Sequence, residues 1–541
     1  MPEVDAPVLV VGARTTGLMM ASELARYGIP VRIVDESPGI DPHVRANLLH
    51  SRTLEIFRTL GIDEAATQGS IAEHGIRIYA QGSLAGELRH APVESPFPYG
   101  MSQSQATTEA VLEAHLRKLG VRVERSVALR NLDPQSDRVV ATIEHSGGRS
   151  ETFETPWLVG CDGAHSAVRH LTGCAFPGET DPYPYLLGDV VVDGPLNEHE
   201  GYVFLHDDGD YFIFSTLPGQ RRLVCATAPP GHPAEKPPTL GDLQRMLDVR
   251  GVSGLRVSDP RWLAYFRIHY RLAPHYRQGR TFLAGDAAHV HSLMAGQGMN
   301  TGIQDAYNLA WKLALVMKGV APQWWLDSYD AERRLVGAQV VTMTQKMTET
   351  LEAFPGLSAK DRERLLGHMF VPESDRIAAA RELQELDLDY AESPLCEDGE
   401  GFTRGPSAGE GAPNVDGLSI DGRPTSVFQV LGTPGYHLFA FIGDLDPADA
   451  FQATAALSAY PWVEPYLVTT RSPAARAGVA ALLDPDGSMH ARYEAQVPTV
   501  YLVRPDGYVA FRQRGLDGVQ HHLSRITSEN APASLSGARH P

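Results

Sequence analysis

Residues 8–35 have the pattern of a strand, a tight turn, a helix and a second strand. The apolar run VLVVG is followed by the helical stretch LMMASELARYG, which ends at Gly28, and by the apolar run VRIVD, which ends at Asp35. Two parallel strands need a crossover connection, and a helix of this length supplies it. The pattern therefore predicts a βαβ unit in an α/β fold.

The turn of this unit, GARTTG, runs from Gly12 to Gly17 and stands where a dinucleotide-binding loop of sequence GxGxxG is expected. Gly12 permits the tight turn, and Gly17 permits close contact between helix and strand. Arg14 replaces the middle glycine; its Cβ would crowd a pyrophosphate, although its guanidinium would attract one. Asp35, 23 residues after Gly12, is the expected acceptor for a ribose hydroxyl. Alone, this altered loop fits an ordinary βαβ turn equally well.

Length, charge and cysteine spacing limit the class of protein. At 541 residues the chain is too long for one core, and about 100–200 residues per domain indicates three or four domains. The net charge of −19 argues against nucleic acid as a partner. The four cysteines form no CxxC pair, so neither a disulfide framework nor a metal site is expected. Without a long apolar run or a secretory leader, we expect a cytoplasmic protein that does not cross a membrane.

The rest of the chain divides by pattern. Residues 158–169 and 281–315 each place an apolar strand before a turn and a helix, which indicates further parts of the same nucleotide-binding layer. Between them, residues 176–272 have alternating and β-branched stretches that predict an inserted sheet. A helical, charged stretch at 322–392 precedes a Gly-, Pro- and acid-rich connector at 397–417, and the final segment predicts a small α/β domain.

The segment CDGAHSAVR ends a strand with a polar turn. Asp162 and Gly163 stand at the strand end, and Ser166 and Arg169 follow one helical turn apart. We expect these side chains to form a polar surface against which a dinucleotide lies.

The segment that follows residue 281 is the most informative. Asp286, at the end of a buried strand, can accept hydrogen bonds from ribityl and ribose hydroxyls. The turn Gly296–Gly298 then begins a helix at 299–302. A helix start offers unpaired N–H groups and about half a positive charge, which suits an anionic ring.

With these motifs in order, the chain resembles the class A flavoprotein monooxygenases of the p-hydroxybenzoate hydroxylase fold, in particular their phenol-hydroxylase-like and polyketide-hydroxylase members. Two further stretches carry the resemblance: RANLLHSRTLEIFRTLGI begins with Arg45, and SQSQATTEAVLEAHL contains Gln105. In the family, the corresponding arginine and glutamine contact the flavin. The resemblance covers roughly residues 6–530.

The resemblance implies a Rossmann-type FAD-binding domain, an inserted antiparallel β-sheet substrate domain, a long helical segment and a C-terminal thioredoxin-like domain that lacks the CxxC pair. The implied limits are 1–175 and 273–395 for the FAD-binding domain, 176–272 for the substrate domain, 396–409 for a linker, 410–528 for the thioredoxin-like domain and 529–541 for a flexible tail. The C-terminal domain is expected to serve in packing or in contact between two copies of the chain.

The resemblance also implies that NAD(P)H reduces bound FAD and that one oxygen atom of O2 enters a phenolic or polyketide-like aromatic substrate. The residues expected to contact FAD are Gly12, Arg14, Thr16, Gly17, Asp35, Glu36, Arg45, Gln105, Asp162, Gly285, Asp286, Gly296, Gly298, Met299 and Asn300. The substrate is expected between the flavin and the inserted sheet, with 202–214 and 223–228 as its floor. The aromatic residues of these two segments are expected to pack in the core.

Catalytic side chains are not identified at this stage. Four histidines near the motifs are candidates for a general base: His43, His50, His289 and His291. The sequence does not rank them, and a lone histidine is more often structural.

One stretch departs from the family. Where relatives commonly have two prolines and a Gly-Gly pair, this chain has the run Ser292, Leu293, Met294, Ala295, Gly296. Losing the fixed φ of proline and gaining N–H donors changes the rigidity and hydrogen bonding beside the flavin. Aromatic hydroxylation is the preferred function; Baeyer–Villiger insertion or oxidative rearrangement on a polyketide ketone, and a cofactor-poor binding partner in which Arg14 prevents tight FAD binding, remain open.

Overall fold

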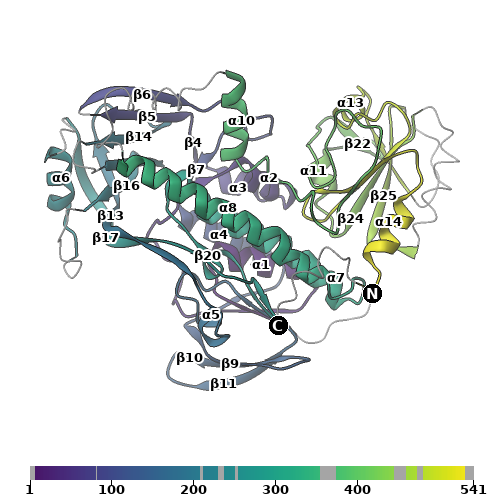
Figure 1. Ribbon diagram of the computed structural model, residues 1–541, viewed down its shortest axis with the longest axis horizontal. Helices are drawn as coiled ribbons and strands as arrows, with labels where there is room; N and C mark the ends of the chain where they lie inside the picture. Colours follow the sequence, from purple (N-terminus) through teal and green to yellow (C-terminus); the bar gives the residue numbers. More distant parts are fainter. Residues whose placement is uncertain are drawn as a thin grey trace.

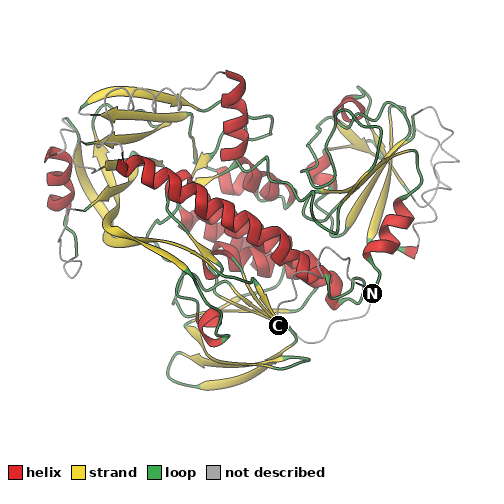
Figure 2. Ribbon diagram, in the orientation of Figure 1, coloured by secondary structure: helices red, strands yellow, loops and turns green. Residues whose placement is uncertain are grey.

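The computed structural model describes residues 7–80, 82–206, 211–228, 237–249, 254–353, 373–443, 459–471 and 479–530. These residues form a larger lobe that contains two main sheets and a smaller C-terminal lobe at the right of Figure 1. Figure 2 shows long helices that cross the middle of the molecule between these sheets. None of the described helices combines the length and the apolar character needed to cross a bilayer.

The first sheet has the strand order β18-β19-β12-β1-β2-β8. Its strands are β1 (Val8–Val11), β2 (Val31–Asp35), β8 (Val123–Arg125), β12 (Leu158–Gly160), β18 (Arg277–Gln278) and β19 (Thr281–Leu283). All neighbours pair in parallel except β18, which is antiparallel to β19. Every residue of β1 is buried, as expected for a central strand of a sheet covered on both faces. The α/β fold and the βαβ unit expected from residues 8–35 are confirmed.

Three helices pack near this sheet. They are α1 (Thr15–Arg26), α4 (Gln105–Lys118) and α7 (Gln297–Met317). Helix α1 contacts both of the others, and α7 is buried along almost its whole length. Because α7 is buried, its polar side chains such as Asp305 and Lys312 need hydrogen-bond partners inside the protein.

The second sheet has eight strands in the order β20-β17-β13-β16-β15-β14-β5-β6. They are β5 (Gly75–Ala80), β6 (Ser83–Arg89), β13 (Gly178–Asp193), β14 (Glu200–Leu205), β15 (Tyr211–Leu217), β16 (Arg221–Thr227), β17 (Arg256–Leu272) and β20 (His289–Val290). The range 176–272 expected for this sheet therefore omits three of its strands. The parallel pairing of β5 with β14 joins residues more than one hundred positions apart, which local patterns do not reveal.

Helices α7 and α8 connect the parts of the molecule. Helix α8 (Trp325–Ala353) runs diagonally across Figure 1, from the second sheet toward the C-terminal lobe, and packs on α7 and β17. Helix α6 (Leu240–Val249) contacts β17, and α10 (Glu373–Leu383) lies near the top of the view. Helices α8 and α10 lie within the helical stretch expected at 322–392.

Smaller elements complete the larger lobe. One three-stranded sheet contains β3 (Leu48–Leu49), β7 (Met101–Ser102) and β4 (Ile71–Ala72). Another contains β9 (Val127–Pro134), β10 (Val139–His145) and β11 (Ser150–Thr155). The short helices are α2 (Ser51–Thr59), α3 (Asp63–Thr67), α5 (Ala167–Leu171) and the 3-10 turns η1 (Gly285–Ala287) and η2 (Met294–Gly296).

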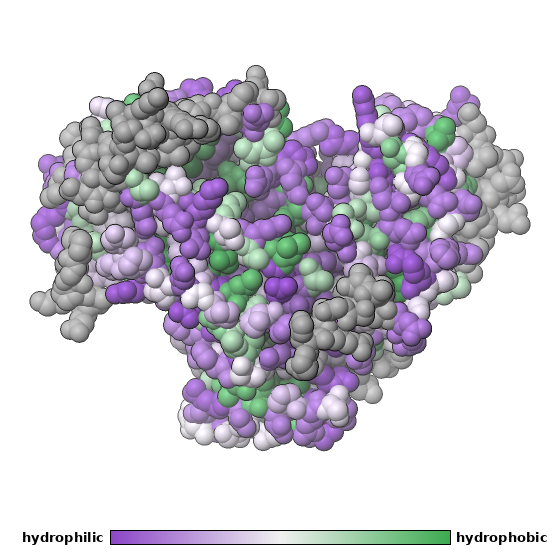
Figure 3. Space-filling view, in the orientation of Figure 1, coloured by the Kyte–Doolittle hydropathy of each residue, from purple (hydrophilic) through white to green (hydrophobic). Residues whose placement is uncertain are grey.

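The C-terminal lobe is built on an eight-stranded sheet of order β21-β28-β27-β24-β25-β26-β22-β23. Its elements are β21 (Glu397–Asp398), β22 (Leu418–Ile420), β23 (Arg423–Thr425), α11 (Val427–Val430), β24 (Tyr436–Phe441), β25 (Val463–Thr469), β26 (Ala480–Leu483), α13 (Ser488–Arg492), β27 (Thr499–Val503), β28 (Val509–Arg514) and α14 (Val519–Ile526). Hydrophilic residues cover most of this lobe in the space-filling view (Figure 3). Of the tail expected at 529–541, residues 531–541 lie outside the described residues.

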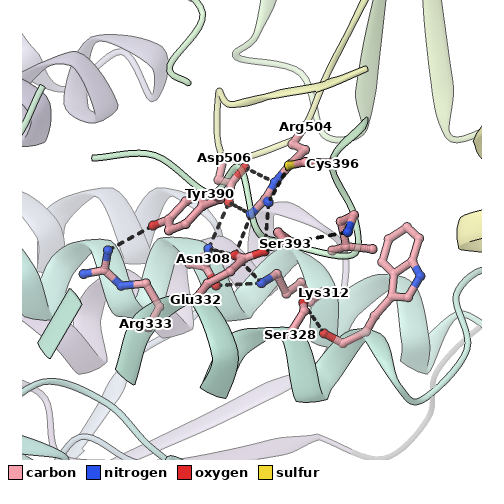
Figure 4. Close-up of polar contacts among 12 residues, drawn as sticks. Asn308, Lys312, Ser328, Glu332, Arg333, Tyr390, Ser393, Cys396, Arg504 and Asp506 are labelled. Atoms are coloured by element: carbon pink, nitrogen blue, oxygen red, sulfur yellow. Dashed lines mark hydrogen bonds and ion pairs between the residues drawn. The ribbon is translucent and has the colours of Figure 1, made fainter. Parts of the chain in front are cut away.

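A buried ionic cluster joins the two lobes. Arg504, in the turn between β27 and β28, donates to both carboxylate oxygens of Glu332 on α8 at 2.8 and 2.9 Å, and to Asp506 at 2.7 Å (Figure 4). Lys312 and Asn308 of α7 also donate to Glu332, each at 2.7 Å. Burial lowers the pKa of Lys312 to about 8 despite Glu332. Removing one member of a buried charge network leaves the charges of its partners uncompensated, which is costly. The cluster therefore ties the C-terminal lobe to α7 and α8.

Candidate active site

A cavity of about 1450 Å³ lies between the first sheet and the second sheet. Drug-sized ligand sites are commonly about 300–1,000 Å³, so this cavity has room for more than one ligand. One part is lined by the Gly12 turn and by strand ends of the first sheet, and the other by apolar residues of the second sheet and α8. The two parts are continuous.

The Gly12 turn packs so closely that neither flanking glycine can carry a side chain. Gly12 has φ +99°, and a Cβ there would overlap the carbonyl oxygen of Cys161. A Cβ on Gly17 would overlap the carbonyl oxygen of Gly12. Arg14 precedes α1 without capping it, so the first N–H groups of α1 stay available beside the cavity. The Arg14 guanidinium instead pairs with Asp41 at 2.8 Å.

Two acidic residues at the end of β2 line the cavity. Asp35 is buried and accepts hydrogen bonds from the N–H groups of Ala13 at 2.6 Å and Ser37 at 2.7 Å. These bonds fix the turn, and each carboxylate oxygen keeps acceptor capacity. Glu36 is exposed, and no described residue forms a hydrogen bond or ion pair with its carboxylate. Its side chain is therefore free to meet a ligand.

Arg45, Gln105 and Asp162 line the same part of the cavity, although they come from distant segments. Arg45 is exposed and lies 3.5 Å from Asp41. Gln105, the first residue of α4, donates to Glu109 at 2.8 Å. Asp162 accepts from Ser166 Oγ at 2.5 Å and from the N–H of Val168. The structure thus brings these three expected residues together.

Ser166 and Arg169 do not form the polar surface expected for them. Both are buried, and Ser166 caps α5 by accepting the N–H of Arg169. The Arg169 guanidinium donates to the carbonyl oxygens of Ala287 and Ala164 at 2.9 and 2.7 Å. Their burial follows from this role, because both side chains hold two turns against each other. That expectation was wrong.

The turn at Gly285 and Asp286 is anchored from within the fold. Gly285 has φ +60°, and a Cβ there would lie 2.6 Å from Thr16 Oγ1. Its N–H donates to Asp305 Oδ2 at 3.0 Å. Asp305 also accepts from Arg333 at 2.7 Å and lies 2.7 Å from His289 Nε2. The turn is therefore fixed, and the exposed Asp286 carboxylate faces the cavity.

Helix α7 begins at the cavity. Gly296, its N-terminal flanking residue, has φ +64° and provides no side-chain cap, and Gly298 and Met299 line the cavity. The helix start therefore presents unpaired N–H groups with partial positive charge. The Asn300 side chain is buried and donates to the carbonyl oxygens of Leu48 and Gly296, both at 2.8 Å, so only its backbone is left to meet a ligand, as expected for the Gly298–Asn300 backbone.

The segment that departs from the family's prolines forms a tight, hydrogen-bonded turn. Ser292 is buried and accepts from Thr348 Oγ1 at 3.1 Å. Ala295 has φ +61°, a left-handed conformation that a Cβ disfavours. Its carbonyl oxygen lies 2.9 Å from His50 Nε2. Hydrogen bonds thus hold this wall where prolines would fix it through φ.

The four candidate histidines have different surroundings. His50 is fully buried, and burial lowers its pKa to about 4. His289 is fully buried against Asp305. His291 lines the cavity, but burial and then the nearby His289 lower its pKa to about 4. His43 is half-exposed and lies 2.9 Å from Asp41. His50 and His289 are therefore structural.

The second part of the cavity is mainly apolar. Val203, Leu205, Ile213 and Leu223 come from the segments expected to form its floor. The aromatic residues of those segments lie in the core, as expected. Sequence reasoning missed the opposite walls, where the lining residues are Trp262 and Phe266 of β17 and Met343, Met347 and Leu351 of α8. Strand alternation in β17 was the one available signal.

Comparisons with known proteins agree with this arrangement. Residues 5–344 match the family model described as "FAD binding domain". The chain is 33% identical to 6-methylpretetramide 4-monooxygenase of Streptomyces rimosus, over 100% of this chain and 98% of that protein. The anhydrotetracycline hydroxylase structure from Streptomyces rimosus is similar with a TM-score of 0.76 and 26% identity, over 96% of this chain and 99% of that one. An aklavinone-11 hydroxylase with FAD and aklavinone has a TM-score of 0.76 and 26% identity, over 97% and 100%.

Proposed function

Because this chain belongs to the FAD binding domain family and is an FAD-dependent monooxygenase, we propose that it hydroxylates a polycyclic phenol in the cavity between its two sheets. Bound FAD, reduced by NAD(P)H, supplies the activated oxygen atom. The protein's own residues bind and orient the two ligands and exclude water from the reacting atoms.

The residues of the first sheet fit FAD. We assign the pyrophosphate to the N–H groups at the start of α1, beside Gly12 and Thr16, because an anion is stabilised at a helix start. We assign the ribose hydroxyls to Asp35, which keeps acceptor capacity beside its two backbone N–H bonds, and to the neighbouring Glu36. Asp286 then faces the ribityl chain. Of the remaining expected contacts, seven line this part of the cavity: Arg14, Arg45, Gln105, Asp162, Gly296, Gly298 and Met299. Gly17, Gly285 and Asn300 do not line it.

Arg14 is compatible with this assignment. Its guanidinium is turned to Asp41, so its charge is partly neutralised. The backbone contact with Cys161 that excludes a side chain is made by Gly12, two residues before Arg14. We therefore expect Arg14 to lower FAD affinity without preventing FAD binding.

The continuity of the cavity carries the substrate proposal. An apolar chamber opens directly onto the start of α7, where the flavin ring is assigned. Strands of the second sheet and α8 line this chamber, and the cavity volume of about 1450 Å³ leaves room for a fused-ring substrate beside FAD. Relatives named for 6-methylpretetramide, anhydrotetracycline and aklavinone act on polycyclic aromatic compounds, which supports the same substrate class here.

We also propose that residues 410–528 are a thioredoxin-like domain with a packing role. Support comes from the parallel strands β24, β25 and β26 beside the antiparallel β27 and β28. All four cysteines precede residue 410, so this domain has no thiol pair for redox chemistry. The substrate domain is best taken as 176–272 together with the two strands β5 and β6.

The visible spectrum and the product mass test this function. The purified protein should be yellow, and with NAD(P)H and O2 it should add one oxygen atom to a polycyclic phenol such as anhydrotetracycline or a close analogue. A new hydroxyl on a ring carbon supports hydroxylation, whereas an oxygen between a carbonyl carbon and its neighbour identifies Baeyer–Villiger chemistry. A colourless protein that FAD does not stabilise contradicts the proposal.

A further inference from the structure

Glu73 lies at the substrate end of the cavity, directly after β4. Its N–H donates to the carbonyl oxygen of Gly100 at 2.9 Å and extends the pairing of β4 with β7. The register of β3, β7 and β4 therefore places Glu73 level with His50, two strands away. Two strand spacings are about 10 Å, and alternation puts Glu73 on the same face as Leu48, which lines the cavity beside Gly296.

The Glu73 side chain is buried and faces the cavity. It is 7% exposed, and its Oε1 lies 3.9 Å from the position that a Cβ on Gly201 would take. Among the described residues, none forms a hydrogen bond with its carboxyl group. An unpaired buried carboxyl is costly to keep, so this group is a candidate for a role in binding or catalysis.

The nearest cation is already committed to other acceptors. Arg222 of β16 donates to the carbonyl oxygens of Glu200 and Asn197 at 2.8 and 2.7 Å, and to Thr216 Oγ1. Burial raises the pKa of Glu73 to about 7, although the charge of Arg222 opposes this shift. Glu73 therefore changes protonation state near neutral pH.

A second polar group lies beside Glu73. His90, just after β6, lines the cavity, and its Nδ1 lies 3.3 Å from the Glu73 carbonyl oxygen. Its Nε2 is buried without a hydrogen-bond partner in the described part of the chain. Burial lowers the pKa of His90, so the ring is neutral. Apolar Ile76 and Leu88 line the cavity around this pair, which makes it a polar end in an otherwise apolar chamber.

We propose that Glu73 accepts the proton of the substrate's phenolic hydroxyl during oxygen transfer. As the ring carbon bonds to one oxygen atom of the oxidant, the O–O bond breaks, the phenolic O–H bond breaks with its electron pair entering the ring, and the proton moves to a Glu73 carboxylate oxygen. The hydrogen of the attacked carbon then leaves as a proton and joins the second oxygen atom, which is released as water, and Glu73 returns its proton to the phenolic oxygen. Reduced FAD and O2 supply the oxidant, so this inference rests on the proposed function.

Other groups facing the cavity fit this role less well. His291 is neutral, with a pKa lowered to about 4 by burial and by His289, and is a weak base. Lys346 of α8 lines the cavity, but an ammonium accepts no hydrogen bond. Asp35 and Asp286 lie at the cofactor end. The charged and titratable groups that surround Glu73 itself are Arg222, His90, His74 and Glu200, which pairs with Arg77.

A fluorescent phenol tests proton acceptance without turnover. 2-Naphthol becomes a strong acid in its excited state, and its neutral and anionic forms emit at different wavelengths. Bound to the FAD-loaded wild-type protein above pH 7, it should show anion emission, because the Glu73 carboxylate takes the proton. The anion emission should fall as pH decreases through about 7. In Glu73→Gln, the anion emission of the bound phenol should be lost at every pH at which 2-naphthol is still protonated in its ground state.

Two further variants control for side effects. Glu87→Gln makes the same chemical change on β6, outside the cavity, where Glu87 faces Arg77 and Arg89, and should leave the emission unchanged. Glu73→Asp keeps a carboxylate at this position and should retain part of the signal. This variant separates loss of the carboxylate from a disturbed fold. In turnover, Glu73→Gln should lower the hydroxylation rate by about 10²–10⁴-fold while leaving FAD content unchanged.

Three results would overturn the inference. They are equal anion emission in wild type and Glu73→Gln, no inflection near pH 7, and failure of 2-naphthol to bind at its solubility limit. The proposed function has a separate test, since a yellow protein that hydroxylates equally well with Glu73→Gln keeps the function and rejects the role of Glu73.

Discussion

The two ends of the cavity are built by different means. At the cofactor end, glycines and backbone N–H groups shape the site, and they come from turns such as Gly12–Gly17 and Gly296–Gly298. At the substrate end, side chains of strands and of α8 shape it, and partners such as β5 and β14 are distant in sequence. We infer that the first end tolerates little change, and that the second can change its side chains and keep the fold.

Gly17→Ala should give the largest effect. Gly17 has ordinary helical geometry, so alanine costs nothing through φ, but its Cβ would overlap the carbonyl oxygen of Gly12. We expect a loss of about 3 kcal/mol or more and no bound FAD, measured by unfolding and by flavin absorbance. Gly28→Ala is the control: Gly28 has φ +69° with open space around it, so about 1 kcal/mol and full FAD content are expected. Equal losses in the two variants would reject close packing as the cause.

The Glu73→Gln variant should become more stable than wild type as pH rises. Burial raises the pKa of Glu73 from 4.5 to about 7, so the folded state holds a proton that the unfolded state releases. Wild-type stability should therefore fall between about pH 4.5 and 7, by about 3 kcal/mol relative to Glu73→Gln. Urea unfolding at several pH values measures this difference. Parallel curves for wild type and Glu73→Gln would show that Glu73 titrates normally.

Val203→Phe should affect the substrate end alone. Val203 lines the apolar chamber on β14, and a larger ring there fills space that a polycyclic substrate needs. We expect kcat/KM to fall by about 10–100-fold with FAD affinity unchanged, because overpacking costs about 1–3 kcal/mol. A drop in FAD affinity of the same size would mean that the two ends are not independent.

Ala295→Gly should have the smallest effect. Glycine relieves the left-handed strain at φ +61°, although it also gives the unfolded chain more freedom. We expect a gain of up to about 1 kcal/mol in unfolding free energy. Ala288→Gly, at φ −101°, lacks this strain and should destabilise. A loss of stability in both variants would argue against strain at Ala295.

The contrast between the two ends also explains what the sequence could predict. Gly12, Asp35 and Asp286, which the sequence predicts to contact FAD, line the cavity because local motifs fix them at strand ends. Trp262 and Glu73 were missed, since their positions depend on pairing between distant strands. Assigning them requires the three-dimensional register.

Ser166 and Arg169 show a second limit. Sequence reasoning placed both side chains at the ligand because they are polar residues that follow a strand. In the fold, their side chains turn inward to satisfy backbone carbonyl and N–H groups. Buried backbone groups need partners, and the sequence does not show which side chain will provide them.

The flavin absorption spectrum, recorded with and without a polycyclic phenol, tests the shared cavity most directly. The FAD-loaded protein should show a perturbed flavin spectrum when anhydrotetracycline binds, because the phenol and the flavin ring would lie in one continuous space. Equilibrium dialysis would establish that the phenol is bound. An unchanged spectrum with the phenol bound, or a protein that takes up no FAD, would contradict the account.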